Sequence, residues 1–266
     1  MNPVSPSRTE RQRTSATKDV LKRALRPRRV VAFVALAATL TVYFAVHRSL
    51  PNFTVWWDVA VLAFLVIPAV FAAVLLLLPL WQLPRRWAVG LAFVALAIVF
   101  SVVGWDGAAS FAKLAAATFL AWWFLDLFEE VSWVVLVAAV IPWVDAYSVF
   151  RGPTKSIVTH HRGVFTQLSF GFPVPGEGGT ANLGIPDLIF FALFLAGTKR
   201  WALRTRVSWI LMTASFGGTI ALAVWLDIGG LHGLPALPLL SLAFFLANGD
   251  LLWLRLRAPN GMTSFR

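Results

Sequence analysis

Residues 59–80 read VAVLAFLVIPAVFAAVLLLLPL, and no charged side chain occurs among them. A helix needs about 20 such residues to cross the hydrocarbon core of a bilayer. Apolar stretches of similar length recur along the chain and predict an all-α fold, a polytopic transmembrane helix bundle of about eight spans. The second span is long enough to tilt, or to bend at Pro68. The expected spans are 30–47, 55–80, 87–104, 108–125, 131–150, 184–198, 207–226 and 234–254.

The composition of the whole chain agrees with lipid as its solvent. Of the 266 residues, 59% are hydrophobic and 13% are charged, whereas about 25% are charged in an ordinary soluble domain. Mean hydropathy is +0.76. A soluble globular protein is therefore excluded. The chain contains no cysteine, which also excludes disulfides, thiolate metal sites and a cysteine nucleophile.

The net charge is +11, and the placement of the basic residues predicts the orientation of the chain. Residues 1–29 carry nine Lys or Arg, and we expect a disordered cytoplasmic tail beside anionic lipid rather than an arm that binds nucleic acid. Of the 23 Lys and Arg, 18 fall on the side of the two termini. The positive-inside rule makes that side cytoplasmic. We therefore expect an integral membrane protein of the plasma membrane, whose partners include the lipid bilayer but no nucleic acid.

The same pattern divides the chain into parts. Behind the tail, residues 30–130 are expected to form N-terminal transmembrane helices. Residues 131–257 form a core whose connection 151–183 faces outward, and residues 258–266 form a second cytoplasmic tail.

Carboxylates inside a span are expensive and mark functional candidates. Most of the acids lie at predicted span ends, where water reaches them. Asp250 is expected to snorkel, or to pair at the inner face. We interpret the following as solvated interfacial groups: Asp58, Asp106, Asp126, Glu129, Glu130 and Asp227.

Two acids remain, Asp145 in WVDAYSVF and Asp187 in LGIPDLIFF. They lie about five residues before one span ends and about three after the next begins, roughly 7.5 and 5 Å below one membrane face. Two carboxyls at nearly the same depth would share a proton. One would act as a base on water and the other as an acid on a carbonyl, which is the chemistry of aspartic proteases.

A third feature reaches the same face. Residues 233–240 read GLPALPLL and open the last span. Proline leaves carbonyls without helical partners and alanine allows close backbone approach, so Pro235, Ala236 and Leu237 could shape a site beside the aspartates. A helix that merely starts with proline and carries no site is the alternative interpretation.

Together these motifs resemble the presenilin and signal peptide peptidase family of intramembrane aspartyl proteases. Family members carry one aspartate in a Tyr-Asp pair, a second in Gly-x-Gly-Asp on the next span, and Pro-Ala-Leu on the last. Here Asp145, Asp187 within GIPD and the tripeptide 235–237 match in order and approximate spacing, across residues 131–254.

The chain also departs from that pattern. Val144 replaces the tyrosine and Pro186 the second glycine, and we expect eight spans where the family has nine. Gly184 is retained. The outward-facing loop is similar to the signal peptide peptidase orientation.

The resemblance implies hydrolysis of transmembrane protein or peptide substrates, with no metal and no organic cofactor. It implies Asp145 and Asp187 as the catalytic pair. The residues that would shape the site and receive the substrate backbone are Gly184, Pro235, Ala236 and Leu237.

The connection between the aspartates is rich in Gly and Pro and contains two β-prone pieces, SIVTHH at 156–161 and VFTQLSF at 164–170. Strand addition from this loop is one means of unwinding a helical substrate, and an ordinary mobile connector is the other interpretation. His160 and His161 lack a third ligand at suitable spacing. HExxH and GxSxG patterns do not occur, which argues against a zinc or serine protease.

A non-hydrolytic membrane protein is the alternative function, either a proton-coupled transporter or a catalytically inactive scaffold. A transporter would place buried polar groups along a path through the bilayer, often with internal repeats. No repeat is evident here, and the polar groups gather at one side. The sequence leaves the oligomeric state open.

Overall fold

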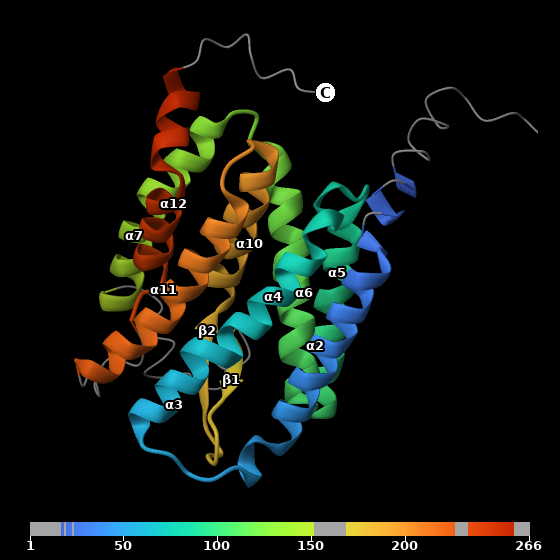
Figure 1. Cartoon of the computed structure of the whole chain (residues 1–266), viewed down its shortest axis with the longest axis vertical. Coiled ribbons are helices and arrows are strands. Elements are labelled where there is room, and N and C mark those ends of the chain that lie inside the picture. The colour runs from blue at the N-terminus through green and yellow to red at the C-terminus, as the bar shows by residue number, and fades with distance from the viewer. Residues whose placement is uncertain (1–16, 19, 23, 152–168, 227–233, 258–266) are drawn as a thin grey trace, which may run out of the picture.

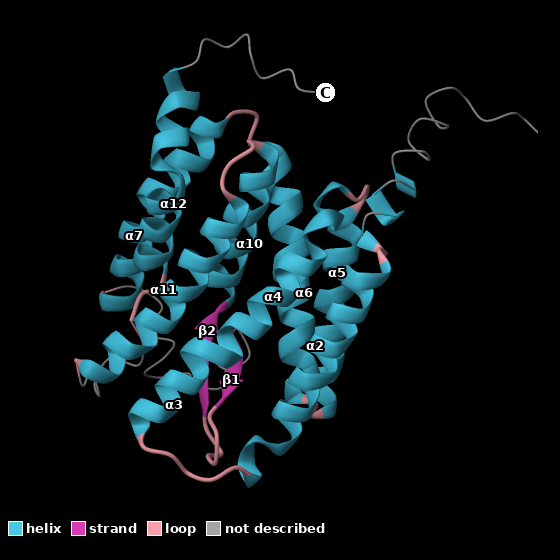
Figure 2. Ribbon diagram, viewed as in Figure 1, coloured by secondary structure: helices cyan, strands magenta, loops and turns pink. Residues whose placement is uncertain are grey.

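The computed structural model describes residues 17–18, 20–22, 24–151, 169–226 and 234–257. Over these residues the chain is mostly helical, with one short β-hairpin (Figures 1 and 2). The first half contains α2 (Pro27–Val46), η1 (His47–Ser49), α3 (Val55–Val61), η2 (Leu62–Val66), α4 (Ile67–Leu77), η3 (Leu78–Gln82), α5 (Arg86–Val103), α6 (Asp106–Phe124) and η4 (Leu125–Leu127). The second half contains α7 (Val131–Phe150), β1 (Ser169–Pro173), β2 (Thr180–Gly184), α10 (Ile185–Arg200), α11 (Thr205–Trp225) and α12 (Leu237–Arg257).

Seven helical segments among the described residues are long and apolar enough to cross a membrane, which confirms a polytopic helical bundle. The expected span that is not among these seven, 184–198, corresponds to α10. This helix has 16 residues, and at 1.5 Å per residue it is about 24 Å long, short of the roughly 30 Å hydrocarbon core. In Figure 2 the hairpin lies directly below α10, so that β2 and α10 together extend along the bundle.

Helix α10 lies inside the bundle. It packs against α6, α11 and α12, and the side chains from Phe191 to Ala196 are completely buried. Phe191 lies 4.1 Å from Phe71 of α4 between ring centroids, and Phe194 stacks on Phe244 of α12 at 4.8 Å. A helix surrounded by protein on all sides is apolar all round, which explains its uninterrupted run of hydrophobic residues.

The long second span has an irregular turn just before Pro68. The five residues 62–66 form a π-helical turn, η2, immediately before Ile67 and Pro68. Because proline has no N–H and its ring crowds the carbonyl four residues back, a widened turn relieves the clash. The close neighbour of η2 is α11, where a Cβ added at Gly217 would lie 2.7 Å from Ala63 Cβ.

The antiparallel hairpin was not part of the all-α expectation. Ser169 pairs with Gly184 at one end of its ladder, and Pro173 pairs with Thr180 at the other. Strand β1 begins within the β-prone VFTQLSF piece and is buried, with Phe170 and Phe172 at 0% and 1% exposure. The other β-prone piece, at 156–161, lies outside the described residues, as do His160, His161 and Asp227.

Helix α2 begins and α12 ends at the same end of the bundle, the upper end in Figure 1. Helix α7 ends, and α10 and α12 begin, away from that end. This arrangement brings the three sequence motifs toward one side of the molecule.

Candidate functional site

Asp145 lies near the end of α7 and is partly exposed. Its Oδ2 accepts a hydrogen bond of 3.2 Å from the backbone N–H of Leu237, the first residue of α12. The first N–H groups of a helix have no partner within that helix, so the carboxylate satisfies a donor that α12 leaves free. This bond joins the first predicted aspartate directly to the Pro-Ala-Leu segment, in which Ala236 and Leu237 are buried.

Asp187 lies in the first turn of α10 and is also partly exposed. Its Oδ2 accepts a 3.1 Å hydrogen bond from the backbone N–H of Gly184, the contact in which a third-position acid reaches back to the N-cap residue. Pro186 fits at this helix start because its missing N–H would be unpaired there anyway. A Cβ at Gly184 would lie 3.2 Å from Asp187 Oδ2, so glycine leaves room for the carboxylate.

The two carboxylates are close enough to interact electrostatically. Helix α12 packs against both α7 and α10, and it therefore links the two helices that carry the acids. Every residue proposed for the site lies near the end of α7, or in or just before the first turn of α10 or α12.

This geometry has a definite chemical capacity. Each carboxylate uses one oxygen to accept a backbone N–H. Two neighbouring carboxylates cannot both ionise cheaply, so the pair tends to hold one proton between them. Such a pair offers a base and an acid within one site, and its protons belong to the pair rather than to either residue.

No protein-family model matches the chain, and a search of curated proteins returned no relative. A functional assignment therefore depends on the residues and their geometry.

Asp58 lies at a span end as expected, but it is not solvated there. Asp58 is only 6% exposed, and its Oδ1 has no hydrogen-bond partner among the described residues. It lies in the first turn of α3, which packs against α11 and is therefore covered by protein instead of water. Its position at a span end could not reveal this, because burial there depends on which helix lies alongside.

Lys113 is the second polar residue whose environment was not predicted. In the sequence analysis it is only one of the basic residues counted to predict the orientation. Its Nζ donates a 3.2 Å hydrogen bond to the backbone carbonyl of Ser169 in β1. The depth of Lys113 in the span could have indicated this environment. It follows Asp106, the first residue of α6, by seven positions, or roughly 10 Å along the helix. A lysine that deep in a span needs an internal partner.

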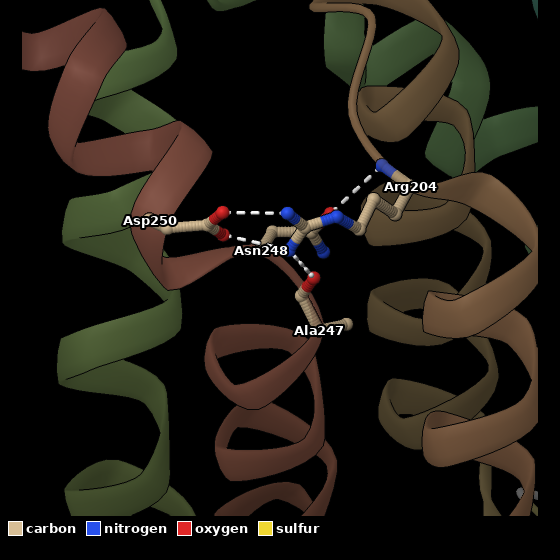
Figure 3. A network of polar contacts seen from close by, with 4 residues as sticks. All are labelled: Arg204, Ala247, Asn248 and Asp250. Carbon is tan, nitrogen blue, oxygen red and sulfur yellow. Dashed lines mark hydrogen bonds and ion pairs between the residues drawn. The ribbon is translucent and has the colours of Figure 1, made fainter.

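A second polar network lies toward the other end of α12 (Figure 3). Asp250 pairs there with Arg204 through two contacts of 2.7 and 2.5 Å, which confirms the expected pairing of Asp250. Asn248 is completely buried, accepts the Arg204 backbone N–H at 2.9 Å and donates to Ser208 Oγ at 2.7 Å. These bonds fasten α12 to the start of α11, so α12 is held here as well as at Asp145.

Proposed function

We propose that this chain is an intramembrane aspartyl protease that hydrolyses peptide bonds of transmembrane segments. The observation that carries the proposal is that Asp145 and Asp187 each accept a backbone N–H from a site-forming segment, on two helices that both pack against α12. The presenilin-like order of motifs supports the same function. Neither a metal nor an organic cofactor is part of the proposed reaction.

In the proposed reaction the ionised carboxylate takes a proton from water as the water oxygen attacks the scissile carbonyl carbon. The protonated carboxyl donates its proton to the carbonyl oxygen. The tetrahedral intermediate then collapses and the C–N bond breaks. The departing nitrogen takes the proton of the carboxyl that acted as base. The other carboxylate takes a hydroxyl proton from the intermediate as its C=O bond re-forms, so the pair again holds one proton. The base and acid roles belong to the pair, because two neighbouring carboxyls titrate together.

Strand β2 is a suitable place for the substrate backbone. It runs directly into Gly184 and the helix of Asp187, and within the described residues it pairs with β1 alone. An extended peptide could add to the other edge of β2 through main-chain hydrogen bonds. Such pairing would unwind a helical substrate next to the two carboxylates, with Pro235, Ala236 and Leu237 on the α12 side.

The test is cleavage of a labelled transmembrane peptide by the full chain reconstituted in liposomes. We expect Asp145→Asn and Asp187→Asn each to abolish cleavage, because each leaves the pair without one acid–base partner. A transition-state analogue of aspartic proteases should inhibit the unmodified chain. Glu129→Gln is the control, because it makes the same carboxylate-to-amide change at an exposed turn away from the pair and should retain activity. Cleavage that survives either pair variant would exclude this mechanism.

A proton-coupled transporter is the second candidate, and buried Asp58 is the observation that favours it. Within the part of the chain that the structure describes, one oxygen of this buried carboxylate has no hydrogen-bond partner, and proton-coupled transporters use carboxylates inside their spans. Proton flux across the same liposomes without peptide cleavage, abolished by Asp58→Asn, would support this function over proteolysis.

A further inference from the structure

Lys113 connects helix α6 to the strand pair beside Asp187. Its ammonium group reaches the carbonyl of Ser169 at 3.2 Å, and Ser169 is 1% exposed. Among the residues described, no other lysine lies so far inside a helix that is long enough to cross the membrane. A charge at this depth is retained only where a specific partner compensates it.

The contact between Lys113 and Ser169 is connected to Asp187 through the hairpin. Ser169 stands directly opposite Gly184 in the antiparallel ladder, and the backbone N–H of Gly184 donates to Asp187 Oδ2 at 3.1 Å. A displacement of Ser169 therefore moves the strand end that supplies this hydrogen bond. Helix α6 also packs along α10, so α6 supports both the helix of Asp187 and the strand that precedes it.

The far end of the hairpin is held separately. The Tyr43 hydroxyl donates to the Pro173 carbonyl at 2.6 Å, and the Gly176 N–H donates to the His47 carbonyl at 2.7 Å. At the end near the site, Phe170 packs against Phe111 and Phe44, but apolar packing has little directionality. The Lys113 bond is a directional contact that orients the backbone there.

We propose that Lys113 is a positioning residue for the protease site. It holds the Ser169 end of the hairpin, and thereby keeps β2 and the Gly184 N–H aligned with the Asp187 carboxylate. This inference rests on the proposed function, but the position of the hairpin can be measured without any cleavage. Because the chain has no cysteine, a single Asn182→Cys substitution gives a unique place for a spin label on exposed β2.

The experiment records the spectrum of this label in full-length protein in lipid nanodiscs, and cleavage of the peptide in parallel. We expect Lys113→Met to increase the mobility of the label and to lower the cleavage rate by about ten-fold or more, because a displaced catalytic group costs that much. Lys113→Arg, which keeps the charge and the donors, should restore both readouts. Lys199→Met, at the other end of α10, is the matched control and should change neither. A label at Arg206→Cys should not respond to Lys113→Met.

An unchanged Asn182→Cys spectrum in Lys113→Met would overturn the inference, whatever the cleavage rate. If that variant does not fold, Lys113→Leu, which also has no donor, takes its place under the same criterion. A mobile label in Lys113→Met, with no cleavage by the unmodified chain, would support the hairpin contact and reject the protease. Mobility that increases equally at both label sites would mean general loosening and would reject the positioning role.

Discussion

At the scale of single residues, the site depends on the small side chain of Gly184. The backbone of Gly184 has φ −63°, which alanine adopts without strain. The obstacle is instead the carboxylate, which a Cβ would meet at 3.2 Å. Glycine is therefore required here for the space that it leaves beside Asp187. A larger residue at this position should affect activity more than stability.

We predict that Gly184→Ala lowers peptide cleavage roughly 10- to 100-fold, because the Asp187 carboxylate must shift. The free energy of unfolding should change little or rise by at most about 1 kcal/mol, because alanine restricts the unfolded chain. Thermal unfolding measures this change. Gly178→Ala is the control, because a Cβ there meets nothing within 4 Å. Equal cleavage by the two variants would show that the space at Gly184 is not needed.

At the scale of elements, α11 crosses the π-helical turn η2 so closely that only glycine fits. A Cβ at Gly217 would lie 2.7 Å from the Ala63 Cβ and 3.1 Å from its Cα. At the next residue, Gly218, a Cβ meets nothing within 4 Å. The two glycines therefore form a matched pair on one helix.

We predict that Gly217→Ala destabilises the protein by about 1–3 kcal/mol through overpacking against a backbone that cannot yield easily. Gly218→Ala should be neutral or slightly stabilising, because alanine is the better helix former. Chemical or thermal unfolding in detergent measures both. Similar stabilities for the two variants would mean that α11 and η2 can move apart at Gly217 without loss of free energy of unfolding.

At the scale of the whole molecule, the distribution of Lys and Arg predicts the orientation in the membrane. The end at which α2 begins and α12 ends should face the cytoplasm, and the turn of the hairpin should face outward. Glu129, in the turn between η4 and α7, and Gly178, in the hairpin turn, are both exposed and test the two sides.

Single cysteines at these positions are unambiguous in a chain that has none. We expect a membrane-impermeant maleimide to label Gly178→Cys on intact cells, and to label Glu129→Cys only after permeabilisation. The reverse pattern would invert the topology and place the proposed site at the cytoplasmic face. Labelling of both on intact cells would contradict a crossing between them.

The helices themselves could be predicted from sequence to within a few residues at most ends, because lipid requires each apolar segment to satisfy its own backbone hydrogen bonds. The hairpin could not. Its strand 180–184 is short and polar, and it is stable only because β1 packs Phe170 and Phe172 into the bundle. The environments of Asp58 and Lys113 were hidden for a related reason, since their burial and partners come from segments distant in sequence.

What the sequence alone determined is a helical membrane bundle and three motifs that point to one face, since hydrophobic length and residue spacing are local properties. What only the tertiary structure decided is which backbone groups meet the two acids. The contact between Asp145 and Leu237 joins residues 92 positions apart, and that between Lys113 and Ser169 joins residues 56 apart. Such contacts depend on how helices pack against each other, and packing is a property of shape complementarity across the whole bundle.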